Sequence, residues 1–223
     1  CQSVLKKAIV KRMLAGHKTG ALPETGETYK VRFALRKNEV EIYLDTSGDG
    51  LHKRGYRRNA TLAPIKETLA AAIADLGRVR RDSLVQDPFC GSGTLIIEAA
   101  QKALNLAPGL RRHFAAEHFA FLPPEIWGQQ REAARDAVRR DAAFEGTGYD
   151  IDPAAVALSR HNAELAGVED CIRFEVADAG KFHRDSEYGQ LVTNPPYGER
   201  LLEKKEAEDL YRMFGAALRD LPP

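Results

Sequence analysis

The sequence Asp-Pro-Phe-Cys-Gly-Ser-Gly-Thr, residues 87–94, indicates the fold of this chain. It follows residues 83–86, Ser-Leu-Val-Gln, which predict the start of a buried strand, and precedes a segment from about Leu95 to Ala103 that predicts a helix. Glycines in such a turn let a ligand approach the backbone, and the free N–H groups of the next helix attract an anionic group. The motif lacks the Gly-Lys-Ser/Thr of a P-loop and the GxGxxG of a dinucleotide site. It predicts a ligand-binding turn of another kind, with a tight strand–helix turn as the alternative.

Strands alternate with helices on both sides of this turn, from residue 61 onward. We expect helices at 62–76, 95–103, 124–142, 153–166 and 206–218, and strands at 83–86, 147–149, 172–176 and 190–193. Pro64 and Gly77 are the start and stop signals of the first helix, and Asp152, Pro153 and Gly167 are those of the fourth. The alternation predicts βαβ units and a parallel sheet.

The first 60 residues have a different pattern and a strong positive charge. We expect a helix over 3–15 ended by Gly16, strands at 29–35 and 40–44, a turn at 45–50 and a basic link, LHKRGYRRN, at 51–59. These residues contain 13 Lys and Arg against 6 Asp and Glu, whereas the remainder contains 20 against 26. A basic segment joined to an acidic one predicts a polyanionic partner for the first part, with an uneven solvated surface as the alternative.

Composition excludes several classes of protein. The chain has 223 residues, 43% hydrophobic and 29% charged, and has no apolar run near the ~20 residues that a membrane helix needs. A secretory leader is absent from these residues. Cys1, Cys90 and Cys171 have neither metal-binding nor disulfide spacing, so we expect no metal and a reducing, cytoplasmic location. The chain begins at Cys1 and ends just after a helical pattern, which predicts a fragment of a longer protein.

Acidic residues follow the next two predicted strands. Asp150 and Asp152 come at the end of the second strand, and Asp178 follows the third. A carboxylate after the second strand can accept hydrogen bonds from both hydroxyls of a ribose. Asp152 is also a helix N-cap, so Asp150 is the better ribose candidate. Asp178 can accept a hydrogen bond from an adenine amino group, with a simple turn aspartate as the alternative.

The sequence Asn-Pro-Pro-Tyr-Gly, residues 194–198, follows the fourth strand. The prolines stiffen the backbone, so the Asn194 side-chain oxygen and the Pro195 carbonyl can point at one place. Two acceptors can hold both hydrogens of an exocyclic amino group and raise the electron density on its nitrogen. Tyr197 offers a flat face for stacking a base, and a base inside a duplex must be flipped to reach such a pocket.

Together these motifs resemble a known family. DPFCGSGT, GYDID, VADA and NPPYG match, in order, the cofactor and catalytic motifs of class I S-adenosylmethionine-dependent methyltransferases of the amino-group type. LDTSGDGLHKRGYR followed by APIKETLAAAI resembles the join between a THUMP RNA-binding domain and its methyltransferase domain. Residues 107–127 resemble the insertion of the bacterial 23S ribosomal RNA guanine-N2 methyltransferases with THUMP domains. The resemblance covers nearly the whole chain and implies methyl transfer to the N2 amino group of a guanine in 23S ribosomal RNA.

The resemblance implies two structural parts. Residues 1–58 would be a partial α+β THUMP-like RNA-binding domain with its basic linker. Residues 59–223 would be an incomplete class I methyltransferase domain, a Rossmann-like α/β sheet that is truncated C-terminally, one helix after NPPYG.

It also implies roles for individual residues. Those around the methionine end of S-adenosylmethionine would be Asp87, Phe89, Gly91 and Gly93. Those at its adenosine would be Asp150 and Ile151, beside the ribose, and Asp178 and Ala179, at the adenine. The target-base pocket would be formed by Asn194, Pro195, Pro196 and Tyr197, and the cofactor would be covered by the region of Pro64 and Glu67. The expected phosphate contacts in the basic link are Lys53, Arg54, Arg57 and Arg58.

Other substrates and functions fit parts of this pattern. Asn-Pro-Pro-Tyr also serves DNA adenine-N6 and protein glutamine methyltransferases, but the basic N-terminal segment favours nucleic acid and the THUMP-like pattern favours RNA. A catalytically silent RNA-binding or ribosome-assembly module is a further alternative, although pure binding does not need two convergent acceptors. Methylation at a pyrimidine carbon needs a cysteine nucleophile near the fourth strand, and neither Cys90 nor Cys171 lies there in sequence.

Overall fold

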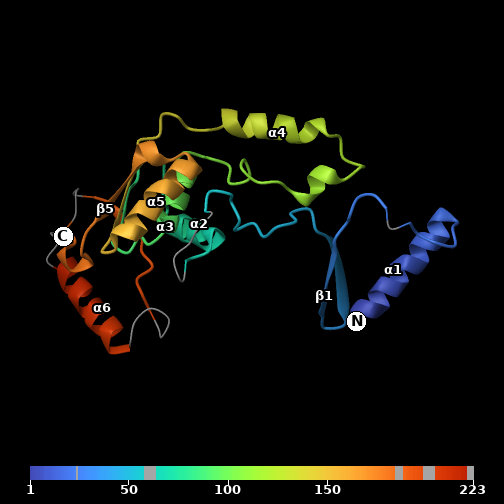
Figure 1. Ribbon diagram of the computed structural model, residues 1–223, viewed down its shortest axis with the longest axis horizontal. Coiled ribbons are helices and arrows are strands. Elements are labelled where there is room, and N and C mark those ends of the chain that lie inside the picture. Colours follow the sequence, from blue (N-terminus) through green and yellow to red (C-terminus); the bar gives the residue numbers. More distant parts are fainter. Residues whose placement is uncertain (24, 58–63, 184–187, 198–203, 220–223) are drawn as a thin grey trace.

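The chain folds into a small N-terminal part and a larger α/β body, which are joined by two extended connections (Figure 1). The computed structural model describes residues 1–23, 25–57, 64–183, 188–197 and 204–219. The elements of the N-terminal part are helix α1 (Gln2–His17) and an antiparallel hairpin of β1 (Val31–Arg36) and β2 (Glu39–Leu44). Lys37 and Asn38 form the hairpin turn with φ of 48° and 65°, a conformation that asparagine tolerates well.

Helix α1 corrects two expectations. It continues past Gly16 to His17, and Lys18, with φ of 50°, caps it by donating its N–H to the carbonyl of Leu14. None of its residues is buried, so the apolar face expected over 3–15 does not form a core with other described residues. Helical periodicity predicts an apolar face on the helix, but it does not predict which residues pack against that face.

The α/β body contains the expected parallel sheet. Its strands are β3 (Leu84–Asp87), β4 (Glu145–Asp150), β5 (Ile172–Val176) and β6 (Gln190–Leu191), and its longer helices are α2 (Glu67–Leu76), α3 (Thr94–Ala103), α5 (Pro153–Ala166) and α6 (Lys204–Arg219). The strand order is β5-β4-β3-β6, and each neighbouring pair is parallel. The chain therefore steps twice to one side of β3 and then reverses to β6 on the other side. Such a reversal leaves a crevice at the carboxyl ends of β3 and β6.

Small residues let the layers of the body approach closely. Ala70 and Ala74 are fully buried where α2 packs on α3. Gly148 of β4 lies under the ring of Phe174, and a Cβ at this position would be 2.5 Å from a ring carbon. A Cβ atom at that distance would overlap the Phe174 ring, so the packing of the ring requires glycine at position 148.

Several predicted boundaries are confirmed and others are wrong. Helix 153–166 and strand 172–176 occur as predicted, and Asp152 caps α5 by accepting a hydrogen bond from the Ala154 N–H at 2.8 Å. The helix expected from residue 62 begins at Glu67 instead, after Lys66, whose backbone is extended, with ψ of 139°. The helix expected over 124–142 is α4 (Glu125–Asp136), which ends where the Asn105 side chain takes the Ala137 carbonyl.

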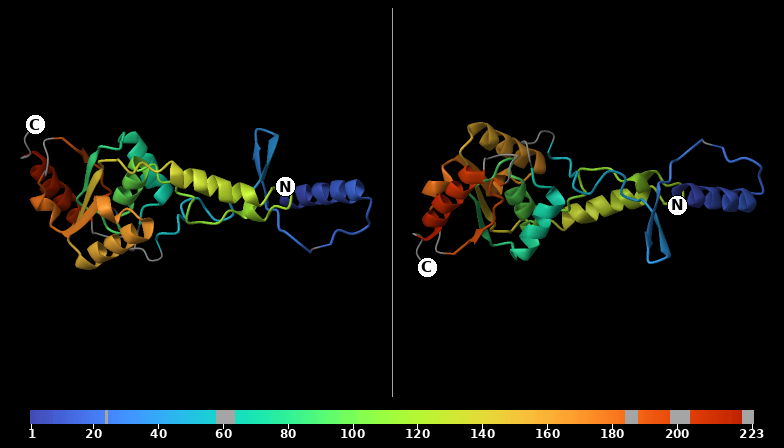
Figure 2. Two further views of the ribbon diagram at one scale, coloured as in Figure 1. Left: turned by 90° about the horizontal axis from the view of Figure 1, so that it is seen from above. Right: turned by 90° about the horizontal axis from the view of Figure 1, so that it is seen from below.

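Residues 104–142 form an arm that leaves the body after α3 and returns to it before β4. Figure 2 shows α4 running between the body and the outer end of the arm in both views. At that end, the Ala116 N–H donates to the Thr46 carbonyl at 3.1 Å, and the rings of Tyr29 and Phe119 lie 4.8 Å apart. The buried Arg112 guanidinium donates to the carbonyls of Ser47, Asp49, Gly50 and Lys53. The arm therefore holds the N-terminal part to the body.

Candidate functional site

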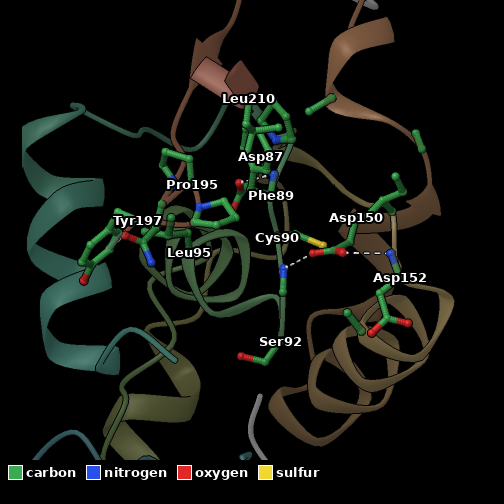
Figure 3. A pocket seen from close by; sticks show the side chains of 18 of the residues that line it. Asp87, Phe89, Cys90, Ser92, Leu95, Asp150, Asp152, Pro195, Tyr197 and Leu210 are labelled. Carbon is green, nitrogen blue, oxygen red and sulfur yellow. Dashed lines mark hydrogen bonds between the residues drawn. The ribbon is translucent and has the colours of Figure 1, made fainter. Parts of the chain in front are cut away.

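A cavity of about 1220 Å³ lies at the carboxyl ends of β3, β4 and β6, where the strand order reverses. It is larger than the ~300–1,000 Å³ of most small-molecule sites. Eleven of the twelve residues expected at the cofactor and the target base line it: Asp87, Phe89, Gly91, Asp150, Ile151, Asp178, Ala179, Asn194, Pro195, Pro196 and Tyr197. Figure 3 labels five of them among the side chains that line the cavity: Asp87, Phe89, Asp150, Pro195 and Tyr197. The structure therefore brings four separate sequence motifs together.

Asp150 ties the glycine turn to the end of β4. Its carboxylate accepts hydrogen bonds from the N–H groups of Gly91, at 2.9 Å, and Asp152, at 3.0 Å, as Figure 3 shows. Gly91 has φ of 53°, which brings its N–H to the carboxylate. Asp150 thus shapes the turn as well as facing the cavity.

Gly93 has a role in packing. It is the twelfth expected residue and does not line the cavity. Its φ is 78°, and a Cβ would lie 2.8 Å from the Phe174 ring and 2.9 Å from Ser159. The glycine is needed for close packing of the turn against β5 and α5, and its expected cofactor contact stays a prediction.

Asp87 is a buried acid between the glycine turn and the loop after β6. Its Oδ1 accepts hydrogen bonds from the Thr193 hydroxyl at 2.6 Å and the Phe89 N–H at 3.1 Å. Burial raises the pKa of Asp87 to about 7, although both hydrogen bonds oppose the shift and nearby Asp150 adds to it. Asp87 therefore changes its charge near neutral pH.

This pKa predicts a pH-dependent effect of Asp87→Asn on stability. Below a pH of about 4 the carboxyl is protonated in both the folded and the unfolded chain, and asparagine mimics it. As the pH rises from about 4 to 7, the unfolded chain loses the proton first, so the Asp87 contribution to stability is lost. We expect Asp87→Asn to become more stable relative to the parent between pH 5 and pH 8, measured by urea unfolding. A constant difference would contradict the raised pKa.

The Asn194–Tyr197 loop is held at both ends. Thr193, which precedes it, binds Asp87, and the Tyr211 hydroxyl of α6 donates to the Pro196 carbonyl at 2.9 Å. The Asn194 side chain makes no hydrogen bond to another described residue, and Tyr197 is 65% exposed. Gly198 of the motif lies outside the described residues. The loop thus presents an available amide and an open ring on a fixed backbone.

The cavity wall is strongly acidic. Its carboxylates are Asp87, Asp150, Asp152, Asp178, Glu206 and Asp209, and none of the described lining residues is Lys, Arg or His. Glu206 and Asp209 come from α6 together with Leu210 and Met213, a helical spacing that could have identified this face from the sequence. Such a wall favours a cationic ligand over an anionic one.

The basic link differs most from expectation. Arg54 pairs with Glu98 at 3.3 Å and Arg57 with Glu67 at 3.0 Å, and each guanidinium is only 12% exposed. Both expected phosphate contacts are thus occupied by carboxylates of the body. Lys53 is exposed beside Asp49, and Arg58 lies outside the described residues.

The predicted domain boundary, between residues 58 and 59, also lies outside the described residues. Tyr56, just before it, packs in the core of the body and donates a hydrogen bond to Glu98. Pro64 lines the cavity as expected of a cover, whereas Glu67 is buried against Arg57.

Two features are absent from the described part of the chain. No helix there is long and apolar enough to cross a membrane. No group of three or more His, Cys, Asp or Glu side chains there could hold a metal ion.

Several known proteins are similar to this chain over most of its length. The profile of the RMKL-like methyltransferase domain matches residues 54–221. "Putative RNA methyltransferase YpsC" of Bacillus subtilis is 43% identical over 99% of this chain and 58% of its own length. Ribosomal RNA large subunit methyltransferase K/L of Aliivibrio salmonicida is 41% identical over 86% of this chain and 28% of its own length. The chain therefore spans less than two thirds of these relatives.

A solved structure extends the comparison. SMU.472, described as "a putative methyltransferase complexed with SAH", superposes with a TM-score of 0.89 and 37% identity, covering 98% of this chain and 58% of that one.

Proposed function

The chain belongs to the family of RMKL-like methyltransferase domains, and we propose that it methylates the N2 amino group of a guanine in 23S ribosomal RNA with S-adenosylmethionine as donor. The observation that carries this proposal is the single cavity that joins the glycine turn, Asp150, Asp178 and the Asn-Pro-Pro-Tyr loop. Names of relatives that refer to ribosomal RNA support the substrate, and an RNA substrate of this kind implies a cytoplasmic location.

The cavity fits the cofactor in size, shape and charge. Gly91 has no side chain to fill the space, and the apolar residues Phe89, Ile151 and Leu210 line it. The acidic residues of the wall suit a positively charged sulfonium group. We assign Asp87, Phe89 and Gly91 to the methionine end, Asp150 and Ile151 to the ribose, and Asp178 and Ala179 to the adenine. The Asp178 carboxylate also accepts the Gly180 N–H at 2.9 Å, which fixes its position. When bound, S-adenosylmethionine supplies a methyl group on a positively charged sulfur.

The Asn-Pro-Pro-Tyr loop provides the base site. The Asn194 oxygen and the Pro195 carbonyl accept the two hydrogens of the amino group, which leaves the nitrogen lone pair free to face the methyl group. Tyr197 stacks on the flipped base. The main contribution of these groups is alignment and electron density at nitrogen, and both act most strongly in the transition state.

Loss of the Asp150 carboxylate should weaken cofactor binding. We expect Asp150→Ala to reduce affinity by about 1–3 kcal/mol, the range for a hydrogen bond to a charged group, because the ribose contact is lost and the Gly91 N–H is released. Isothermal titration calorimetry measures this, with exposed Asp170→Ala as the matched control. Binding of full strength by Asp150→Ala would remove the ribose assignment.

The proposed reaction has a direct test. The protein is incubated with tritiated S-adenosylmethionine and ribosomal RNA that lacks the modification, and the nucleosides are separated. We expect label in N2-methylguanosine. Label in N6-methyladenine of a DNA substrate or in protein glutamine would replace the proposed acceptor, and binding of RNA without transfer would indicate a silent RNA-binding module.

We also propose that residues 1–58 form a THUMP-like RNA-binding part and residues 59–223 the catalytic domain. The excess of 13 basic over 6 acidic residues within residues 1–60 supports RNA binding there. Lys53 remains the expected phosphate contact among the described residues of the link.

A further inference from the structure

A basic cluster lies at the amino end of β3, away from the cavity. We define it as Arg80, Arg81, Lys102 and Arg139 together with their neighbours in sequence, Arg78 and Arg140. Four of these, with Val79 and Asn105, line a hollow of about 530 Å³. The turn before β3, the end of α3 and the segment after α4 meet here, and the Arg139 N–H donates to the Leu104 carbonyl at 2.8 Å.

Acidic residues neutralise part of the charge in this cluster, and the exposed Asp82 directly follows Arg81 in sequence. Lys102 pairs with Asp75, and Arg81 pairs with Asp141 at 3.4 Å in an exposed ion pair. The guanidinium groups of Arg80 and Arg139 make no ion pair or hydrogen bond with any other described residue, and both side chains are exposed. Two free cations therefore border a concave surface.

Helix ends explain only part of the cluster. Helices α2, α3 and α4 end nearby, and their C-terminal dipoles attract cations by about 0.3–1 kcal/mol each within the last turn. Lys102 of α3 and Arg135 of α4 already lie in last turns. Arg80, Arg81, Arg139 and Arg140 lie beyond the helices, so the dipoles do not account for them.

An RNA substrate needs phosphate contacts that the cavity does not provide. The cavity wall is acidic, and Arg54 and Arg57 are occupied by Glu98 and Glu67. Strand β3 has four residues, about 13 Å at 3.3 Å per residue, and it leads from the cluster to the cavity. A few nucleotides of RNA backbone are long enough to cover that distance.

We propose that the basic cluster binds the phosphate backbone of the RNA whose base enters the cavity. This inference rests on the proposed RNA methyltransferase function and adds a second anchoring surface to it. Arg80 and Arg139 make the main contacts, and Arg78, Arg81 and Arg140 extend the positive surface on either side. Contacts of this kind position the RNA without reading its sequence.

Neutralising the two free guanidiniums tests the proposal. Fluorescence anisotropy with a labelled ribosomal RNA fragment gives the affinity of the parent and of Arg80→Gln/Arg139→Gln at several salt concentrations. We expect the slope of log affinity against log salt to become less steep by about 1–2, because each lost phosphate contact removes about 0.7–0.9. Affinity near 0.1 M salt should fall about tenfold or more. Cofactor affinity by calorimetry should not change.

Arg173→Gln is the control, since Arg173 is an exposed arginine near Glu145 of β4 and outside the cluster. Unchanged affinity and slope in the double variant, in a protein that methylates ribosomal RNA, would overturn the inference and leave the proposed function intact. A parent protein that neither binds nor methylates ribosomal RNA would instead overturn the proposed function. An equal loss of RNA affinity in Arg173→Gln would mean that only the net charge of the protein matters, and this result would also overturn the inference.

Discussion

Replacing Asn194 with alanine is expected to lower the rate of methyl transfer by about 10²–10³-fold, the scale for one preorganised polar group at a transition state. The Asn194 amide faces the cavity and has no hydrogen bond to another described residue, so its oxygen is available to the amino group. Thr193 and Tyr211 hold the backbone on either side, so the substitution should leave the loop in place. Cofactor affinity should barely change, because Asn194 belongs to the base side of the cavity.

Single-turnover kinetics on saturated enzyme measure this effect separately from binding. Tyr197→Ala is the comparison: it should weaken capture of the base by about 1–3 kcal/mol through lost stacking, and Tyr197→Phe should be tolerated. Near-normal transfer by Asn194→Ala would show that the Asn-Pro-Pro-Tyr loop is only a rigid turn, and the amino-group acceptor would have to be abandoned.

Replacing Arg57 with methionine is expected to lower the free energy of unfolding by about 3–5 kcal/mol, the range for breaking one side of a buried ion pair. The substitution leaves the Glu67 carboxylate, 4% exposed, without its cation. It also removes the hydrogen bonds that Arg57 donates to the Ile65 carbonyl at 2.9 Å and to the Thr94 hydroxyl at 3.3 Å. Ile65 and Thr94 line the cavity, so cofactor affinity should fall as well.

Urea unfolding of Arg57→Met and of the double variant Arg57→Met/Glu67→Met separates these effects. The double variant should recover most of the lost stability, because no charge remains buried alone. Arg81→Gln is the control, since its ion pair with Asp141 is 62% and 75% exposed and contributes only about 0–1 kcal/mol. If Arg57→Met lowers the free energy of unfolding no more than Arg81→Gln does, the Arg57–Glu67 ion pair does not stabilise the cavity wall.

Local signals explain which elements could be predicted. Asp152-Pro153 at the start of α5 and Gly167 after it act within a few residues, so that helix was predicted correctly. The cavity was also predictable, because the carboxyl ends of parallel strands converge and each motif follows a strand.

Long-range partners explain what could not be predicted. Arg54 and Arg57 look like free charges in the sequence, but Glu98 is 44 residues from the first and Glu67 is 10 from the second. At the end of α4, the Asn105 side chain donates a hydrogen bond to the Ala137 carbonyl, 32 residues later in the chain. A pattern of charges indicates that ion pairs can form, and only the packing of α2 and α3 decides which ones do.

The arm between α3 and β4 and the link that ends at Arg57 together set the distance between the N-terminal part and the cavity. Helix α4 has 12 residues, which rise about 18 Å at 1.5 Å per residue. At the outer end of the arm, Arg112 and Ala116 donate hydrogen bonds to carbonyls of the turn after β2. At its inner end the arm leads into β4, beside the glycine turn. The span of the arm therefore contributes to the distance between the turn after β2 and the cavity. Under the proposed function, this distance would decide the choice of the nucleotide that reaches the cavity when residues 1–58 bind the same RNA. Lengthening α4 by one turn would move that choice by about 5 Å without altering any residue of the cavity.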